Sequence, residues 1–239
     1  MGSEMCIRDS IITQRMWATI ELAIGGWAFA ILLGIPTGVL AAVKRGTFWD
    51  YIARSVAIVG QGAPPFVIGL LLIVIFAVWL QDTPFELPAG GRPPVFSIKT
   101  YILPCIALGW PAAAGLMRLT RSAMLEVLDS EFVKLARAKG VGWNKVIYKH
   151  ALKNALITPL TSALLLFSGW LNGALVIEII FGWPGIGYDA LFTAVNDNDF
   201  PLLQGTVFFF VIIFVIFALM ADLLYTIIDP RVRITGEES

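Results

Sequence analysis

The stretch ARAKGVGWNKVIYKHALKNA, residues 136–155, is a polar and basic segment in a chain that is otherwise strongly apolar. It holds four lysines and one arginine but no acidic residue, and apolar runs flank it on both sides. Over the whole chain, 58% of the 239 residues are hydrophobic and only 14% are charged. A soluble domain carries roughly 25% charged residues, so the composition predicts a membrane protein with one long polar loop.

Five apolar stretches approach or exceed the roughly 20 residues that a bilayer-crossing helix needs. Their apolar runs are continuous rather than alternating, which predicts helices, and the expected fold class is all-α, a polytopic transmembrane helical bundle. Pro104 and Pro111 interrupt the third stretch, and neighbouring helices can satisfy the backbone groups that prolines free. The predicted spans are residues 17–43, 53–80, 101–120, 155–181 and 202–228.

Basic residues favour the cytoplasmic side of a membrane, and they are unevenly distributed between the predicted spans. The connections 44–54 and 118–153 and the C-terminal segment are basic, whereas 81–100 holds two basic residues and 181–201 holds none. We therefore expect the basic connections and the C-terminus to be cytoplasmic and the other two connections to be external. Two arginines before the first span conflict with this orientation, and a missing upstream helix would explain them.

The external connection FGWPGIGYDALFTAVNDNDFP, residues 181–201, combines a Gly/Pro turn with a short helical stretch. We expect either a short interfacial helix or a plain loop there. Trp183 and Tyr188 suit the membrane–water boundary, where amphipathic aromatic rings settle.

Local signals in the polar segment predict a first short helix. Asp129 or Ser130 can cap a helix that begins near Glu131, and Gly140 can end it in a left-handed turn. This helix is too short to cross a bilayer, so its apolar stripe is expected to pack on protein. The stripe consists of Phe132, Leu135 and Ala136.

A second short helix is expected to begin near Asn144. Its basic face and its apolar face follow from four-residue spacing. The basic face is Lys145, Lys149 and Lys153, and the apolar face is Ile147, Ala151 and Ala155.

Two interpretations of this helical pair are open. It can dock on a partner protein, with small residues at 136–140 letting another backbone approach closely. Alternatively, it can lie on the membrane with its lysines facing anionic headgroups, at about 1 kcal/mol each. We favour lipid contact for the lysine face and docking for residues 136–140, because a glycine ends the first helix where a basic membrane anchor would continue.

The segment ARAKGVGWNKVIYKHALKNAL resembles the cytoplasmic loop motif of permease subunits from binding-protein-dependent ABC importers, most of all the oligopeptide, dipeptide and nickel group. In the family's general pattern, a Glu-Ala-Ala triplet precedes a glycine, and an apolar–x–Leu–Pro ending follows. The triplet aligns with residues 134–136 and the ending with residues 150–153. Ala136, Gly140 and Leu152 match this pattern, whereas the leading Glu and the final Pro are absent.

Most of the chain between residues 17 and 233 shares the resemblance, which implies a type I ABC importer permease-like bundle of the first-permease type. Family members usually have six spans, so five spans here suggest an N-terminally truncated copy. The expected organisation is a foreign leader or remnant at 1–16, a transmembrane permease domain at 17–233 with a cytoplasmic coupling loop at 122–154, and a cytoplasmic tail at 234–239. The similar stretches are LLGIPTGVLAAVKRGTFWD (32–50), YILPCIALGWPAAAGLMRLTRSAMLEVLDSEFVKLARAKG (101–140), VIEIIFGWPGIGYDAL (176–191) and ADLLYTIIDPRVR (221–233).

The resemblance also implies partners in a bacterial or archaeal inner membrane: a second homologous permease subunit, two ATPase subunits and an external solute-binding protein. The solute would be a peptide or a similar small molecule. Closure of the ATPases would pull the loop helices and switch the pathway from inward-facing to outward-facing. The residues expected to couple to the ATPase are Phe132, Leu135, Ala136, Arg137, Ala138, Lys139 and Gly140.

The chain lacks the GxxxxGK[ST] loop that binds nucleotide phosphates. We therefore expect ATP and Mg to be bound by the partner ATPase and no cofactor in this chain. Two cysteines and a single histidine favour neither a disulfide framework nor a metal centre. No catalytic arrangement stands out, and no nucleic acid partner is expected.

Polar residues within the apolar stretches have two interpretations. Glu21, Glu178 and Asp222 each lie within roughly 10 Å of a span end at about 1.5 Å rise per residue. We expect hydrogen bonding at helix ends rather than a proton relay, because a charge at mid-bilayer costs about 2.5–3.5 kcal/mol. Three more residues are expected either to line a polar pathway or to pack between helices. They are Gln61, Ser168 and Asn172.

Glycine pairs at GxxxG spacing, 34–38 and 169–173, permit close helix contact. Two other classes of function remain open. A self-sufficient secondary transporter or channel would need inverted repeats and mid-bilayer charges, which the sequence does not clearly show. A structural membrane subunit without a pathway would leave the long polar loop unexplained.

Overall fold

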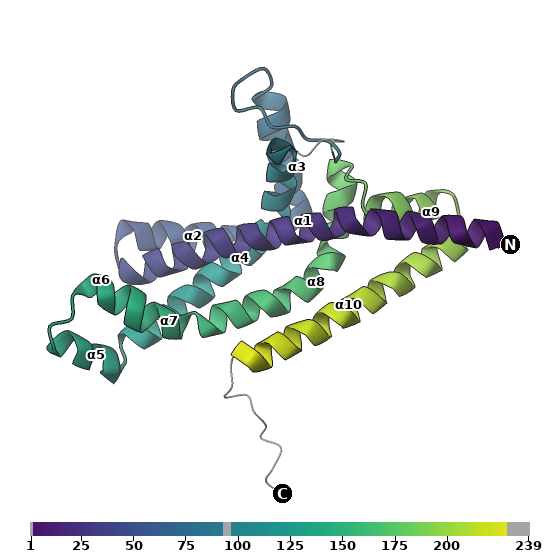
Figure 1. The fold of residues 1–239 in the computed structure, drawn as a ribbon. Coiled ribbons are helices and arrows are strands. Elements are labelled where there is room, and N and C mark those ends of the chain that lie inside the picture. Colours follow the sequence, from purple (N-terminus) through teal and green to yellow (C-terminus); the bar gives the residue numbers. More distant parts are fainter. Residues whose placement is uncertain (1, 93–96, 229–239) are drawn as a thin grey trace, which may run out of the picture. The chain divides into compact units, whose positions relative to one another are not determined.

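The computed structural model describes the backbone of residues 2–92 and 97–228, and its side chains apart from those of residues 2–14, 168–173, 189–190, 193, 217, 221–222 and 224–228. The described backbone forms helices and connecting turns and contains no strand, so the predicted all-α fold class is confirmed. The helices, with π-helical segments labelled η, are α1 (Gly2–Val43), α2 (Phe48–Gly62), α3 (Pro65–Ile73), η1 (Val74–Trp79), α4 (Ile98–Leu128), α5 (Glu131–Ala138), α6 (Trp143–Lys145), η2 (Val146–Ala151), α7 (Leu152–Ala155), α8 (Ile157–Phe181), η3 (Ile186–Phe192), α9 (Thr193–Asn196) and α10 (Phe200–Ile228) (Figure 1).

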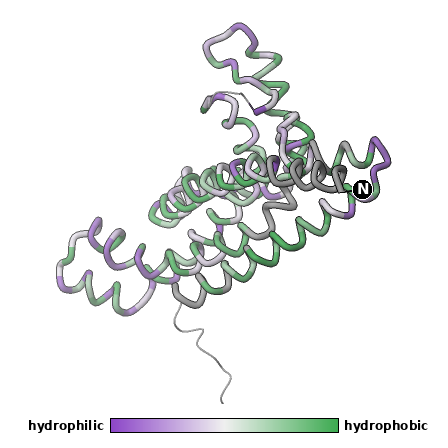
Figure 2. The backbone as a smooth tube through the Cα atoms, turned by 45° about the vertical axis from the view of Figure 1, so that its right-hand side comes forward, coloured by the Kyte–Doolittle hydropathy of each residue, from purple (hydrophilic) through white to green (hydrophobic). Residues whose placement is uncertain are grey.

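Three of the described helical segments are long and apolar enough to cross a membrane: Arg15–Val43, Ile98–Leu128 and Phe200–Met220. They occupy the first, third and fifth predicted spans. Figure 2 shows the described part of α10 as an almost uninterrupted hydrophobic helix. α4 continues through both of its prolines, so the expected interruption of the third span is wrong.

The second predicted span, 53–80, is broken into α2 and the α3–η1 helix. Pro64 is extended, with φ −60° and ψ 144°, and Pro65 is the first residue of α3. A proline lacks the N–H that continues a helix and disfavours helical backbone in the residue before it, which accounts for the break. The fourth predicted span, 155–181, is occupied by α8, a helix of 25 residues.

The chain folds into two compact units. The first unit comprises residues 1–29, 63–110 and 167–217, and the second unit comprises residues 30–62, 111–166 and 218–239. Both connections predicted to be external belong to the first unit. The connections 44–54 and 118–153, predicted to be cytoplasmic, belong to the second unit.

The core of the first unit is centred on Trp183, which is completely buried. Its indole Nε1 donates a hydrogen bond to the carbonyl oxygen of Ala18 at 3.0 Å, and its ring meets the edge of Tyr101 at a centroid distance of 4.7 Å. The expectation that Trp183 lies at the membrane–water boundary is therefore wrong, because its N–H has a partner inside the protein. The surrounding buried residues are Ala18, Leu22, Leu103, Ala107, Leu108, Ala174, Ile177 and Phe181.

In the second unit, α1 and α4 pack through the GxxxG pair Gly34 and Gly38, both of which are buried. A Cβ atom at Gly38 would lie 2.6 Å from the carbonyl oxygen of Met117 and 2.7 Å from Cβ of Thr120. A Cβ atom at Gly34 would lie 2.6 Å from the carbonyl oxygen of Ala113. The first glycine pair therefore does serve close helix packing.

Candidate functional site

The polar segment folds into two short helical pieces, α5 and α6–η2–α7, which form a hairpin in the second unit (Figure 1). We call residues 131–155 the α5–α7 hairpin. α5 begins at Glu131 as predicted, with Ser130 in extended backbone at the N-cap position. The Ser130 hydroxyl does not cap α5, because it donates to the carbonyl oxygen of Val127 at the end of α4. Ser130 thus ties the start of α5 to the last turn of α4.

Gly140 ends α5 in the predicted left-handed conformation, with φ +78°. Its N–H donates to the carbonyl oxygen of Arg137 at 2.9 Å, and the N–H of Val141 donates to that of Ala136 at 3.2 Å. These bonds satisfy carbonyl groups that the helix end leaves free. A non-glycine residue is disfavoured here by backbone conformation, although nothing within 4 Å would obstruct its Cβ atom.

The inner face of the hairpin is apolar and well packed. Val133 of α5 is completely buried, and α5 contacts η2. The predicted apolar face of the second helix is confirmed, since Ile147, Ala151 and Ala155 are all buried. They cluster with residues from the ends of α1 and α4, namely Val39, Ala42 and Met124. Hydrophobic packing therefore fixes the hairpin to two long helices.

The outer face of the hairpin carries large apolar side chains that stay about half exposed. The predicted stripe of α5 was expected to be packed, but Phe132 and Leu135 are 46% and 57% exposed. Within the chain, Val133 is the fully buried residue of α5, so packing of this stripe on protein stays a prediction about a partner. An apolar patch exposed to solvent is typical of a protein contact site.

Sequence reasoning missed two residues of this outer face, Trp143 and Tyr148, which are also exposed. The guanidinium of Arg137 lies over the Trp143 ring at 5.0 Å, a cation–π contact that joins the two arms of the hairpin. Gly142, Trp143, Asn144 and Lys145 line a hollow of about 320 Å³ beside this contact. The sequence did carry a signal for this face, because two aromatic residues stand in an otherwise basic segment.

The remaining predicted coupling residues lie around the end of α5. Ala136 is half-buried, whereas Ala138 and Lys139 are exposed. Lys134 donates a hydrogen bond to Glu131 at 2.8 Å, and this bond holds the pKa of Lys134 above its usual value. The predicted basic face is exposed at Lys145, Lys149 and Lys153, so the hairpin presents positive charge next to its apolar patch.

Glu21 forms a hydrogen-bonding cluster in the first unit; it lies inside α1 rather than at its end, and its partners are Arg92 and Tyr101, which lie before and near the start of α4. Arg92 donates to the two carboxylate oxygens of Glu21 at 2.8 and 3.0 Å, and the Tyr101 hydroxyl donates at 3.0 Å. This bidentate contact with Glu21 raises the pKa of Arg92. Nearby, Gly91 donates its N–H to the carbonyl oxygen of Phe181 at 2.8 Å, so the connection between η1 and α4 is held at two points.

Glu178 is completely buried and holds the turn that follows α8. One of its carboxylate oxygens accepts the N–H of Gly187 at 2.7 Å and that of Tyr188 at 3.3 Å. The N–H of Ile186 donates to the Thr19 hydroxyl at 2.9 Å. Glu178 thus satisfies backbone groups at the start of η3, which supports helix-end bonding. This connection contains two short helices, η3 and α9, where the sequence left a short helix and a plain loop open.

The other predicted pathway residues are only partly described. Gln61 is exposed at the end of α2, and its Nε2 lies 3.0 Å from where a Cβ atom of Gly115 would be. The side chains of Ser168, Asn172 and Asp222, and of the second glycine pair at 169–173, lie outside the described residues. The described residues do not bring a polar pathway together.

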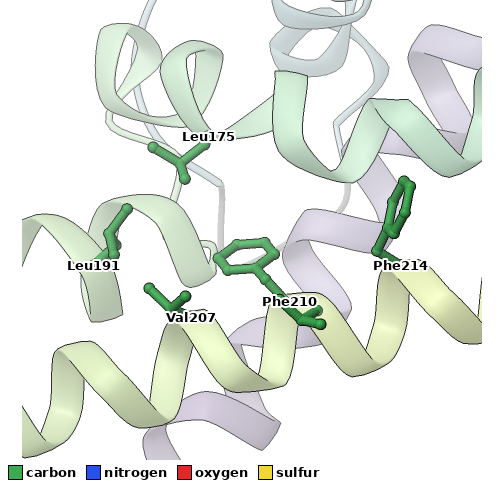
Figure 3. Close-up of a pocket in the computed structure, with 6 residues that line it drawn as sticks. Leu175, Leu191, Val207, Phe210 and Phe214 are labelled. Carbon is green, nitrogen blue, oxygen red and sulfur yellow. The ribbon is translucent and has the colours of Figure 1, made fainter.

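An apolar pocket of about 250 Å³ opens on the first unit between α8, η3 and α10 (Figure 3). The described residues that line it all have aliphatic or aromatic side chains. Among the described residues, no group of three or more His, Cys, Asp or Glu side chains is placed to hold a metal ion. The residues lining the pocket are Leu175, Leu191, Val207, Phe210, Val211 and Phe214.

Comparison with known proteins gives one family. The profile of the family described as "Binding-protein-dependent transport system inner membrane component" matches residues 34–234. The chain is 40% identical to the dipeptide transport system permease protein DppB of Alkalihalophilus pseudofirmus, over 93% of this chain and 74% of that protein. It is 36% identical to the glutathione transport system permease protein GsiC of Escherichia coli, over 98% and 73% of the two chains.

Solved structures agree on the fold. An amino acid ABC transporter crystallised with histidines superposes with a TM-score of 0.72 at 15% identity, over 93% of this chain and 96% of that one. The MetNI methionine ABC transporter in an inward-facing conformation superposes with a TM-score of 0.70 at 16% identity, over 92% and 96%.

Proposed function

The chain belongs to the family of binding-protein-dependent transport system inner membrane components, and from this membership we propose how it is driven and what it carries. It is a membrane permease subunit of an ABC importer, not an enzyme, and in these importers the ATPase is a separate subunit. Our proposal is that the ATPase docks on the outer face of the α5–α7 hairpin. The solute is a peptide or a similar small molecule.

The exposed apolar patch of the hairpin is the observation that carries the docking proposal. Phe132 and Leu135 face outward on a short helix whose opposite face, at Val133, is buried. A helix fixed on one side and apolar on the other is suited to a groove in a soluble partner. The basic side chains at the end of α5, those of Arg137 and Lys139, would complement an acidic rim around such a groove.

The partner set we propose is a second homologous permease subunit, two ATPase subunits and an external solute-binding protein. ATP and Mg are bound by the ATPase subunits. Their closure moves the hairpin, and the hairpin moves the helices on which it is packed, which switches the pathway from inward-facing to outward-facing. In this account the hairpin and the C-terminus are cytoplasmic. The segregation of basic connections into the second unit supports this orientation.

The relatives support a peptide as the solute, because they include permeases named for dipeptide, peptide and glutathione transport. Competition assays test this assignment. Uptake of a labelled dipeptide into proteoliposomes should be inhibited by unlabelled di- and tripeptides and not by free amino acids. Inhibition by amino acids alone would contradict it.

Co-purification tests the docking proposal. The wild-type chain should co-purify with its ATPase subunit. Leu135→Asp should lower the amount of ATPase recovered at least tenfold, because a carboxylate cannot enter an apolar groove without a partner. Lys153→Gln is the matched control, since it lies on the same hairpin but on the basic face that we assign to lipid. Equal ATPase recovery with Leu135→Asp and the wild type would contradict docking at this face.

A further inference from the structure

The carboxylate of Asp50, in the first turn of α2, is 1% exposed and is the one buried carboxylate among the described side chains of the second unit. Arg121 of α4 donates to both of its oxygens, from Nε at 2.8 Å and from Nη2 at 3.0 Å. The backbone N–H of Gly46 donates to the same carboxylate at 3.0 Å. Arg54 lies one turn further along α2, with its Nε 3.4 Å from Asp50.

This cluster joins three parts of the backbone. Gly46 belongs to the turn after α1, Asp50 to the start of α2, and Arg121 to the part of α4 that leads into α5. A bidentate guanidinium–carboxylate pair fixes orientation as well as distance. One side chain therefore locks the α1–α2 turn to the helix from which the hairpin extends.

The hairpin itself packs directly on α1 and α4. Its inner residues Ile147 and Ala151 pack with Val39 of α1 and Met124 of α4. Met124 follows Arg121 by three residues, so it lies one helical turn further along α4. A displacement of the hairpin therefore acts on a stretch of α4 that also carries the Asp50 contact.

A second ion pair in this region provides a comparison. Arg45 and Asp129 lie 3.7 Å apart, with side chains 63% and 76% exposed. An exposed pair of this kind is screened by solvent and constrains little. Separating Asp50 from Arg121, in contrast, would leave the buried carboxylate with only the Gly46 N–H and the more distant Arg54, so this contact resists being pulled apart.

We propose that Asp50 and Arg121 are positioning residues for transport, which transmit displacement of the α5–α7 hairpin from α4 to the start of α2. The proposal rests on the docking function proposed above. Neither residue touches the ATPase in this account. Their contribution is to make α2 and the end of α1 move together with α4 when the hairpin moves.

The test uses the complete transport complex in proteoliposomes, with uptake of a labelled dipeptide and ATP hydrolysis measured on the same preparation. Asp50→Asn and Arg121→Gln should lower the number of peptides taken up per ATP hydrolysed at least fivefold, with ATPase recovery unchanged. The double variant should be no worse than either single variant, because both remove the same link. The control Arg45→Gln/Asp129→Asn should retain the wild-type ratio.

If the neutral variants fail to assemble, Arg121→Lys provides the test. It keeps the positive charge but loses the two-pronged contact, so the ratio should fall at least twofold while the complex still forms. An unchanged ratio in any assembled variant of Asp50 or Arg121, or an equal fall in the exposed-pair control, would overturn the proposal. If the wild type does not bind the ATPase at all, it is the docking function that fails.

Discussion

The turn after α8 in the first unit and the α5–α7 hairpin in the second unit both contain glycines and aromatic residues, but they use them in opposite ways. At the turn, Glu178 at the end of α8 and Trp183 just after it are completely buried. In the hairpin, Trp143 and Tyr148 are exposed. The difference separates a scaffold, whose residues are buried within the chain, from an exposed surface that we propose a partner covers.

The polar contacts of the two regions show the same contrast. Glu178 accepts backbone N–H groups within the protein, and the indole of Trp183 donates to a carbonyl on another helix. In the hairpin, the Lys134–Glu131 pair lies at the surface, three residues apart on the same helix. Substitutions in the turn are therefore expected to affect stability, and substitutions on the outer face of the hairpin are expected to affect binding.

The largest effect expected from this comparison is that of Trp183→Ala. Removing a buried tryptophan costs about 3–5 kcal/mol, and it also removes the hydrogen bond to Ala18, so the melting temperature in detergent should fall sharply. Trp143→Ala is the matched control. It should lower the melting temperature far less, since it loses only an exposed cation–π contact with Arg137, while weakening ATPase binding. A similar loss of stability in both variants would contradict the distinction between the buried turn and the exposed face of the hairpin.

Matched glycine substitutions in the two regions should differ in stability by less than the two tryptophan variants do. A Cβ atom at Gly187 would lie 2.7 Å from Cγ of Leu175 and 2.8 Å from a carboxylate oxygen of Glu178, so Gly187→Ala should cost about 1–3 kcal/mol by overpacking. At Gly142 nothing lies within 4 Å and φ is −60°. Gly142→Ala should therefore be neutral in the same thermal assay. Equal melting temperatures for the two variants would contradict this account of the turn.

The smallest effect concerns Gly140, where space is free but the backbone is left-handed. Gly140→Ala should cost about 1 kcal/mol through backbone strain alone. Gly140→Asn should cost less, since asparagine adopts this conformation more readily. Thermal melts of the two variants check the order. If alanine and asparagine behave alike, then the left-handed turn does not limit substitution here.

Periodicity and terminator residues were sufficient to predict much of the hairpin. Gly140 as a helix end and Ile147, Ala151 and Ala155 as a buried face follow from local patterns, and the structure confirms both. The packed face of α5 could not be predicted in this way. In a helix of eight residues, either Val133 or the Phe132–Leu135 stripe can face inward, and only the position of α5 on η2 selects between them.

Contacts between residues far apart in the chain could also not be predicted from the sequence. Trp183 appeared suited to an interface because its partner, the carbonyl of Ala18, lies 165 residues away. Asp50 and Arg121 are separated by 71 residues, and neither forms part of a local motif. The break between α2 and α3 was in principle predictable, because two consecutive prolines stand at 64 and 65.

Cysteine labelling at position 135 tests the central claim that the outer face of the hairpin is a cytoplasmic docking surface. Leu135→Cys would be placed in a chain whose own cysteines, Cys6 and Cys105, are replaced by serine and alanine. A membrane-impermeant maleimide should label it in inverted vesicles and not in right-side-out vesicles, and added ATPase should slow labelling at least tenfold. Labelling from the outside, or an unchanged rate with the ATPase bound, would contradict the claim.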